Sequence, residues 1–376
     1  MSRLINLNSA HGEPASRRDT VDATDPSRAA VQRTVMTKKV VRLSDVAVAA
    51  GTSAKTASRV INGDPRVAAE TRQRVEEAVV RLGYRVDLLA RSLRRGVDDT
   101  IGVIVESIAD PFFAAVISEI ELAALRRGLN VIVASNRRLP NREVTIVDTL
   151  QQRRVAGLII TPHAADLSYL ADTPTPVVFV DRHPRNYPAD VVVFDDRGGA
   201  RTAVRHLIRH GHGRIAFISD DLDIETSRNR HAGYLDALTE AGIPVAPELI
   251  ATACIDATVA RARTLDFLDL DDPPTAIFSA RSETSLGVVK VLHDRGRTDI
   301  AMVSFGDFAL ADVLSPAITV LEQPPELLGR LAVERLFMRL DGIGSEPVST
   351  VIPLRLVPRG SGEIVPAVET TGLSMA

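Results

Sequence analysis

The chain has 376 residues, of which 45% are hydrophobic and 25% are charged, and its formal net charge is -3. This length predicts two or three domains, and the composition is that of a soluble globular protein. No apolar run approaches the roughly 18 residues of a membrane span, and the first residues lack the apolar core of a secretory signal. The single cysteine, Cys254, excludes an intrachain disulfide. We therefore expect a cytoplasmic protein with no membrane partner.

Charge is distributed unevenly along the chain. Residues 36–96 carry 13 Lys and Arg against 6 Asp and Glu, whereas residues 97–376 carry 27 against 38. A basic segment is therefore joined to an acidic body. This pattern is typical of a nucleic-acid-binding domain attached to a second domain with another task.

Residues 38–84 carry three short helical patterns, preceded by a stretch without hydrophobic periodicity, residues 1–37, which we expect to be disordered. The first pattern ends at Gly51, and the second begins at Ser53, whose hydroxyl can cap a helix. The third follows Ala68, which cannot provide such a cap. Two short helices joined by a Gly-Thr turn, in a basic three-helix unit, predict a helix-turn-helix domain.

A helix-turn-helix domain reads DNA with its second helix, which enters the major groove by its N-terminus. This geometry would bring Ala54 and Lys55 to the base edges, and Arg59 lies on the same helix face and can bond guanine twice. The small hydroxyl groups beside them suit phosphates. Taken alone, the segment could also be a helical hairpin that packs on a partner with its cations in solvent. The predicted DNA contacts of this domain are Thr52, Ser53, Ala54, Lys55, Thr56, Ser58, Arg59 and Asn62.

From Ile101 onward, short apolar strands alternate with helical patterns. Two series of strands are predicted, residues 101–105, 131–135, 157–161, 177–181 and 191–194, and then residues 214–219, 249–253, 276–280 and 302–305. Strands of this kind predict parallel sheets covered on both faces, and nine of them fit two doubly wound lobes. We assign these lobes to residues 98–365, followed by a flexible tail, residues 366–376. Ligands bind such sheets at the carboxyl ends of the strands, so we expect a pocket between the lobes.

Six motifs follow one another between Arg42 and Gly362: LSDVAVAAGTSAKTASRVING, IGVIVESIADPFF, VVFVDR, HLIRHGHGRIAFIS, RHAGYLDAL and ITVLEQPPELLG. Their order and spacing resemble the lactose/galactose repressor (LacI/GalR) family. The resemblance implies an N-terminal all-α helix-turn-helix domain and an α/β sensor like a periplasmic binding protein, with two doubly wound parallel-sheet lobes. It also implies a homodimeric, nucleoid-associated repressor of a metabolic, carbohydrate-type operon, which binds a near-palindromic double-stranded operator under allosteric control by a small-molecule effector.

The resemblance assigns a hinge to residues 85–97. In that family the hinge becomes helical on DNA and inserts a leucine into the minor groove. The matching leucine is Leu93, and the accompanying DNA contacts are Ala90 and Arg91. Leu93 could instead pack at a domain junction, but the arginines around it suit phosphate better than a core. The proline usual in the family after the tyrosine is missing after Tyr84, which leaves the free hinge less restricted.

The resemblance also implies an effector site in the cleft. Asp110, Phe112 and Phe113 follow the first strand, where an aromatic ring can stack on a sugar or a base, or else pack in the core. Arg230 matches the family's ligand-binding arginine, a forked donor that can hold two adjacent hydroxyls or a carboxylate. The other predicted effector-binding residues are Asn136, Asp181, Arg281, Phe305, Asp307 and Gln323.

Two segments of the cleft depart from the family pattern. Arg281 and Ser282 stand where the family has an Asn-Asp pair, and the family's Gly-Phe-Asp-Asp loop is altered at residues 304–307. The lost groups normally bind a neutral polyol, so we expect an anionic or otherwise atypical effector, such as a sugar phosphate. Arg281 could instead pair internally with a cleft acid such as Asp307. A regulator without any effector is a further alternative.

The sequence predicts no metal, no cofactor and no catalytic centre. His206, His210 and His212 invite a metal interpretation, but His212 is expected to bond backbone and no cysteine or clear carboxylate completes a site. No nucleophile elbow, phosphate loop or dinucleotide motif occurs, so an enzyme is not predicted. The main alternative is a solute-binding protein for transport with an unrelated N-terminal helical module. No heptad-like tail follows Val365, so a dimer is expected rather than a tetramer.

Overall fold

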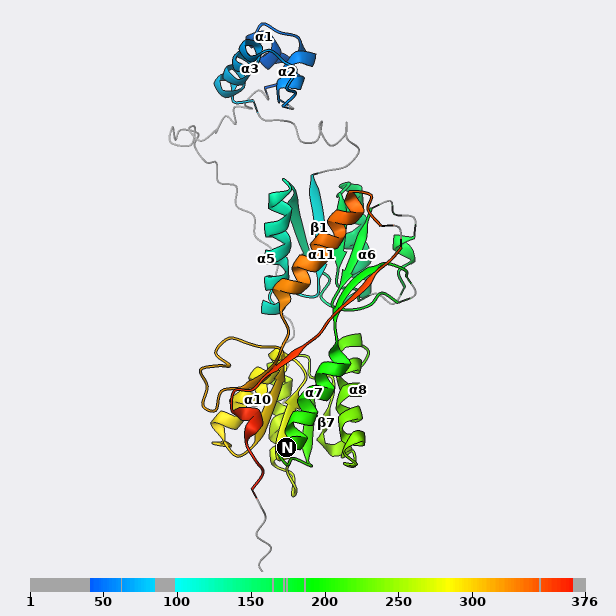
Figure 1. Ribbon diagram of the computed structural model, residues 1–376, viewed down its shortest axis with the longest axis vertical. Helices are drawn as coiled ribbons and strands as arrows, with labels where there is room; N and C mark the ends of the chain where they lie inside the picture. Colours follow the sequence, from blue (N-terminus) through cyan, green and yellow to red (C-terminus); the bar gives the residue numbers. More distant parts are fainter. Residues whose placement is uncertain are drawn as a thin grey trace, which may run out of the picture. The chain divides into compact units, whose positions relative to one another are not determined.

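The computed structural model describes residues 41–367, apart from residues 62, 85–98, 164–165, 172, 174, 186 and 345. The chain divides into two compact units, one ending at Val86 and one beginning at Asp87 (Figure 1). The N-terminal extension, the hinge and the C-terminal end of the predicted tail lie outside the described residues. Asn62 of the small unit and the hinge residues Ala90, Arg91 and Leu93 also lie outside the described residues, so these proposed DNA contacts stay predictions.

Three helices form the small unit, α1 (Leu43–Ala49), α2 (Ala54–Ile61) and α3 (Ala69–Leu82). They enclose a core of small apolar side chains, which allows the helices to approach closely. Its buried members are Val46, Ala47, Ala50, Ala57, Val60, Val75 and Ala78. The three predicted helices and the turn between the first two are confirmed.

Local signals in the sequence explain where these helices begin and end. Gly51 and Gly83 follow α1 and α3 with φ angles of 62°, a conformation that glycine adopts without strain. The Ser53 hydroxyl accepts a hydrogen bond from the backbone N–H of Thr56 at 3.1 Å, which satisfies a free donor at the start of α2. Ala68 precedes α3 and makes no side-chain capping bond, as its sequence predicts.

The larger unit contains two lobes, each built on a six-stranded sheet. In the first, the N-lobe, the strands run in the order β11-β5-β4-β3-β1-β2 and all neighbours are parallel. Helices α5 (Pro111–Arg126) and α11 (Pro325–Leu340) cover one face of this sheet, and α6 (Pro140–Gln152) covers the other. The strands are β1 (Thr100–Val105), β2 (Asn130–Ser135), β3 (Gly157–Ile160), β4 (Val177–Val180), β5 (Asp190–Phe194) and β11 (Ser349–Ile352).

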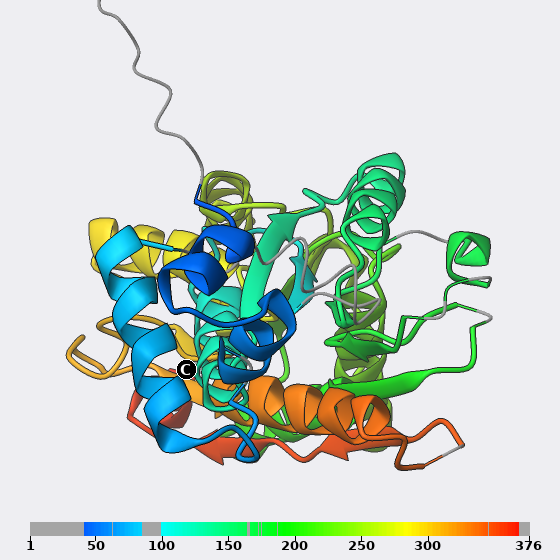
Figure 2. The same cartoon turned by 90° about the horizontal axis from the view of Figure 1, so that it is seen from above.

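The second lobe, the C-lobe, has the strand order β12-β10-β9-β8-β6-β7, parallel except for β12, which is antiparallel to β10. Helices α7 (Asp196–Arg209) and α8 (Glu225–Glu240) pack on one face, and α9 (Ala257–Leu268) and α10 (Ser282–Asp294) on the other. The strands are β6 (Ile215–Ile218), β7 (Ile250–Ala251), β8 (Ala276–Ser279), β9 (Ala301–Phe305), β10 (Thr319–Glu322) and β12 (Arg355–Val357). The view in Figure 2 shows helices on both sides of the strands.

The chain crosses between the lobes three times, at residue 195, at residues 323–324 and at residues 353–354 (Figure 1). Each lobe is therefore built from segments far apart in the sequence. All nine predicted strands are present, and the predicted fold class, a helix-turn-helix unit followed by two parallel-sheet lobes, is confirmed. Within the described part of the chain, no helix combines the length and the apolar character that crossing a membrane requires.

Candidate functional site

Helix α2 presents a polar surface on the small unit. Ser53, Ala54 and Lys55 are exposed at its N-terminal end, while Ala57 and Val60 on the opposite side are buried in the core. Among the described residues, no carboxylate forms an ion pair with Lys55. Because the ammonium group of Lys55 is exposed and has no carboxylate partner there, it can approach a polyanion without first breaking an ion pair.

Arg59 lies on the same helix but is engaged by Asp64. Its Nε atom donates to the Asp64 carboxylate at 2.9 Å, and the same carboxylate accepts from Arg66. Hydrogen bonds from Arg66 and Arg59 hold the pKa of Asp64 well below its usual range, so this acid is charged at neutral pH. The ion pair with Asp64 therefore competes with the contact to guanine that we predict for Arg59.

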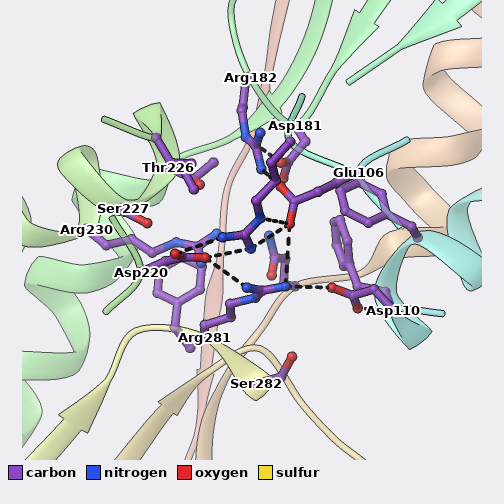
Figure 3. A pocket seen from close by; sticks show the side chains of 16 residues that line it. Glu106, Asp110, Asp181, Arg182, Asp220, Thr226, Ser227, Arg230, Arg281 and Ser282 are labelled. Carbon is purple, nitrogen blue, oxygen red and sulfur yellow. Dashed lines mark hydrogen bonds and ion pairs between the residues drawn. The ribbon is translucent and has the colours of Figure 1, made fainter. Parts of the chain in front are cut away.

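The larger unit contains a small, charged cavity between its lobes, of about 50 Å³ (Figure 3). Side chains from both lobes line it. Eight of the ten predicted effector-binding residues are among them, namely Asp110, Phe112, Phe113, Asp181, Arg230, Arg281, Phe305 and Gln323. The lining that the sequence analysis missed consists of Glu106, Arg138, Arg182, Asp220, Ile224, Thr226, Ser227 and Ser282. We call this space the central cavity.

Arginines and carboxylates fill most of the central cavity. Glu106, directly after β1, lies 2.6 Å from Arg138 and 2.5 Å from Arg182. Burial disfavours the charged carboxylate, but the guanidinium groups of Arg182 and Arg138 outweigh it and lower the pKa of Glu106 to about 2. Asp220 lies two residues beyond the end of β6. Its carboxylate accepts from Arg138 at 2.7 Å and from Arg281 at 2.8 Å. Arg138, Arg182 and Arg281 thus join Glu106 and Asp220 in a connected network of ion pairs.

Arg230, on helix α8, is buried and lines the cavity. It donates to Asp196 at 2.7 Å and to the carbonyl oxygen of Ala280 at 2.8 Å, and its guanidinium carbon lies 3.9 Å from the centre of the Phe305 ring. Burial raises the pKa of Asp196 to about 7, although the nearby Arg230 opposes this. A guanidinium fixed on three sides is oriented for a ligand before any ligand arrives.

Two aromatic side chains lie where helix α5 begins. Asp110 caps this helix by accepting from the N–H of Phe112 at 3.0 Å. Phe113 is 3% exposed and belongs to the N-lobe core, and its ring meets that of Phe112 edge to face at 5.1 Å. Both rings also reach the cavity wall. The two alternatives in the sequence analysis, core packing and a cavity-lining ring, therefore coexist.

The structure places two of the predicted residues outside the central cavity. The amide of Asn136 is fully buried within the N-lobe, where its nitrogen donates to Glu143 at 3.0 Å and to the carbonyl of Thr161, so it does not line the central cavity. Asp307 binds Arg359 at 2.9 Å and lines a neighbouring cavity instead. Arg281 does pair internally, as one alternative held, but with Asp110 and Asp220 rather than with Asp307.

The three histidines that suggested a metal have other partners. His206 contacts Glu363 at 2.5 Å, and the His210 ring bonds the carbonyl oxygen of His206 at 2.9 Å. His212 lies before β6 and contacts the Ile364 carbonyl oxygen at 2.8 Å, which confirms the predicted bond to backbone. In the described part of the chain, no cluster of His, Cys, Asp and Glu side chains is arranged to hold a metal ion.

The missed residues share a signal that the sequence contains. Glu106 and Asp220 follow the buried strands β1 and β6, and Arg138 lies three residues beyond β2. The carboxyl ends of parallel strands meet at one edge of a sheet, so charged residues just after such strands are candidates for a cleft. Arg138 reaches the cavity because it and Arg137 adopt left-handed backbone conformations, with φ angles of 60° and 53°.

Comparison with known proteins gives two family matches. A family described as bacterial regulatory proteins of the lacI family matches residues 42–87, and one described as a periplasmic binding protein-like domain matches residues 204–362. The first covers the small unit, and the second covers most of the C-lobe and parts of the N-lobe.

Whole-chain relatives agree with these matches. The HTH-type transcriptional regulator GalS of Salmonella typhimurium is 30% identical over 301 residues, covering 78% of this chain and 88% of GalS. The HTH-type transcriptional repressor PurR of Vibrio atlanticus is 30% identical over 305 residues, covering 79% and 91%. The crystal structure of the Lac repressor dimer bound to operator and the anti-inducer ONPF has a TM-score of 0.78 and 30% identity, covering 86% of this chain and 99% of that one.

Proposed function

Since this chain belongs to the LacI family of bacterial regulatory proteins, and is a DNA-binding transcriptional regulator, we propose that it represses transcription by placing helix α2 in the major groove of a near-palindromic operator. The observation that carries this proposal is the exposed N-terminal end of α2, with Lys55 free of ion pairs among the described residues, on a unit with its own core. The family match at residues 42–87 argues against a transport protein with an unrelated helical module.

The proposed contacts divide by chemistry. Ala54, Lys55 and Arg59 face the base edges, and the small hydroxyls of α2 and its turn bind phosphates. Beyond the described residues, Asn62 and the hinge residues Ala90, Arg91 and Leu93 complete the interface. A homodimer supplies two such units, one for each half-site of the operator. The remaining contacts in this proposal are Thr52, Ser53, Thr56 and Ser58.

The proposed control element is a small molecule bound between the lobes, in the chemical range of a sugar, a sugar phosphate or a similar polar compound. Two larger cavities, of about 660 and 590 Å³, adjoin the central cavity and share lining residues with it. Their size suits a molecule of this class. We further propose that the protein acts in the cytoplasm, and that it is not an enzyme, because its relatives are named as regulators.

Lys55→Ala tests the DNA-binding role of α2. We expect the variant to lose preference at one position of each operator half-site, roughly tenfold or more, because one base contact discriminates by about 1–3 kcal/mol. Gel shifts against an operator library, repeated at several salt concentrations, measure both affinity and base preference. Lys290→Ala is the matched control, because Lys290 is an exposed lysine of the C-lobe that pairs with Asp294 at 2.9 Å.

Two outcomes would count against this assignment. If Lys55→Ala weakens binding equally for every sequence, Lys55 contacts phosphate alone. If the unmodified protein prefers no sequence in the library, the proposal that it reads an operator through α2 is wrong. Lys290→Ala should leave both affinity and preference unchanged, since it removes the same charge from a different unit.

A further inference from the structure

Two arginines span the cleft between the lobes in opposite directions. Arg138 of the N-lobe reaches Asp220 of the C-lobe, with a closest nitrogen-to-oxygen distance of 2.7 Å. Arg281 of the C-lobe reaches Asp110 of the N-lobe at 3.1 Å, as Figure 3 shows. The lobes are therefore joined by a reciprocal exchange of charge, and Arg281 also lies 3.7 Å from Glu106 of the N-lobe.

Each of these arginines also has a carboxylate partner within its own lobe. Arg138 lies 2.6 Å from Glu106, and Arg281 lies 2.8 Å from Asp220. If the lobes separate, both guanidinium groups keep one ion pair. Only Asp110 loses its arginine, and it still accepts a hydrogen bond from the N–H of Phe112 at the start of α5. The main cost of breaking a buried ion pair is the buried charge that is left without a partner. Opening of the lobes leaves no such charge.

A second tier of contacts joins the lobes at the edge of the cleft. The backbone N–H and the ring Nδ1 of His183 in the N-lobe contact the two carboxylate oxygens of Glu225 at 2.7 and 2.8 Å. Arg185, two residues later, donates to the carbonyl oxygen of Asp223 at 3.2 Å. These bonds are more exposed than those of the central cavity, so we assign them a supporting part in closure.

The arginines occupy the central cavity itself, whereas the two larger cavities that suit an effector adjoin it. The central cavity of about 50 Å³ accommodates a few water molecules and not a sugar. The side chains of Arg138 and Arg281 are 24% and 19% exposed, and the carboxylates they bridge are 5% and 13% exposed. Ion pairs at this depth are screened by salt much less than surface pairs.

We infer that the Arg138–Asp220 and Arg281–Asp110 pairs form an interlobe latch, which holds the lobes closed without an effector and which an effector must displace where it enters the central cavity. The lobe arrangement is set by the protein's own side chains, and a ligand acts by its differential affinity for the latched and the open arrangement. Arg138 and Arg281 are thus specificity-determining residues, because a molecule that enters the cavity has to replace their bonds to Asp220 and Asp110. Any effect of the latch on repression rests on the proposed function. Closure of the lobes by the latch does not depend on that function.

Asp110→Asn and Asp220→Asn test the latch in the full chain. Asparagine caps a helix about as well as aspartate, so Asp110→Asn keeps the start of α5 intact while removing one charge. Spin labels on one exposed residue of each lobe, introduced as cysteines in protein diluted with unlabelled chain, report the interlobe distance. The buried Cys254 is not accessible to the label. Asp236→Asn is the matched control, because Asp236 pairs with Arg197 at 2.7 Å within the C-lobe.

Without any added small molecule, the unmodified protein should give a single short interlobe distance. Each latch variant should lower the ratio of closed to open molecules about tenfold or more, and the double variant should lower it further. Asp236→Asn should not change the distance. An open unmodified protein, or a double variant as closed as the unmodified one, would overturn the inference.

Operator affinity measured on the same samples separates this inference from the proposed function. If the latch variants open the lobes and also change the operator affinity, both the latch and the proposed function are supported. Lobes that open with no change in operator affinity support the latch and contradict the proposed control of DNA binding. If the protein binds no operator, the distance measurement still decides whether the latch exists.

Discussion

Glu106 is the side chain on which the charge balance of the central cavity depends, since it contacts both Arg138 and Arg182. Its pKa is about 2 in the folded protein, against an ordinary value of 4.5. The carboxylate is charged more readily in the folded chain than in the unfolded chain. It therefore stabilises the fold above pH 4.5, and this contribution disappears as the pH falls through about 2.

Glu106→Gln should lower the free energy of unfolding at pH 7 by about 3 kcal/mol, because the pKa difference corresponds to roughly this amount. The difference from the unmodified protein should shrink as the pH falls from 4.5 towards 2. Urea unfolding at pH 7, 4.5 and 3 measures it. Glu322→Gln is the control, because Glu322 forms an exposed pair with Arg355 and should matter by less than about 1 kcal/mol. A difference for Glu106→Gln that is constant with pH would contradict this account.

The sequence predicted which residues lie near the central cavity better than it predicted where their side chains point. Asp110, Asp181 and Arg281 follow buried strands and were predicted at the cavity because the carboxyl ends of parallel strands converge, whereas Glu106 and Asp220, which follow β1 and β6, were missed. Asn136 satisfies the same rule, but its amide turns inward to Glu143. Arg138, two residues later, enters the cavity because of consecutive left-handed backbone conformations. Side chains alternate between the two faces of a strand, but this rule does not extend into such a turn. The sequence therefore could not predict that Arg138, and not Asn136, would reach the cavity.

Helices α7 and α8 pack against each other through a glycine. A methyl group at Gly233 of α8 would lie 2.2 Å from the carbonyl oxygen of Arg197 and 2.9 Å from the Cβ atom of Ala200, both on α7. Neither neighbour is the end of a flexible side chain. The close approach of these two helices, and hence the position of Arg230 on α8, depends on the absence of a side chain at this point.

Gly233→Ala should therefore destabilise the C-lobe by about 3 kcal/mol or more, even though alanine favours a helix by about 1 kcal/mol over glycine. Thermal unfolding of the larger unit reports the loss. Gly213→Ala is the control, because a methyl group there meets no atom within 4 Å, and it should change stability by less than about 0.5 kcal/mol. If Gly233→Ala instead raises stability, the two helices separate easily and the packing argument is wrong.

Among the elements, the sequence revealed the strongly apolar strands and missed β10, β11 and β12. β11 and β12 lie at the edges of their sheets and are partly exposed, so they lack the continuous apolar run that marks the inner strands. They also return to sheets that began more than 100 residues earlier in the chain. Pairing of this kind depends on tertiary contacts, and no local pattern encodes it.

The basic N-terminal segment and the acidic body of the chain correspond to two units with separate cores. The core of the small unit contains only valine and alanine among its buried residues. The larger unit has four clusters that include leucine, isoleucine and phenylalanine. Because burial of apolar area provides most of the stability of a fold, the small unit is the weaker of the two.

Calorimetry of the full chain should accordingly show two transitions. Unfolding absorbs about 0.7 kcal/mol per residue, so the small unit accounts for roughly 30 kcal/mol and the larger for about 190 kcal/mol. Val75→Asp, which places a carboxylate in the core of the small unit, should abolish the lower transition alone. A chain without residues 1–98 should keep the upper transition within about 2 °C and lose all operator binding. A single transition that Val75→Asp lowers as a whole would mean that the two units unfold as one, and that the separate cores do not make separate domains.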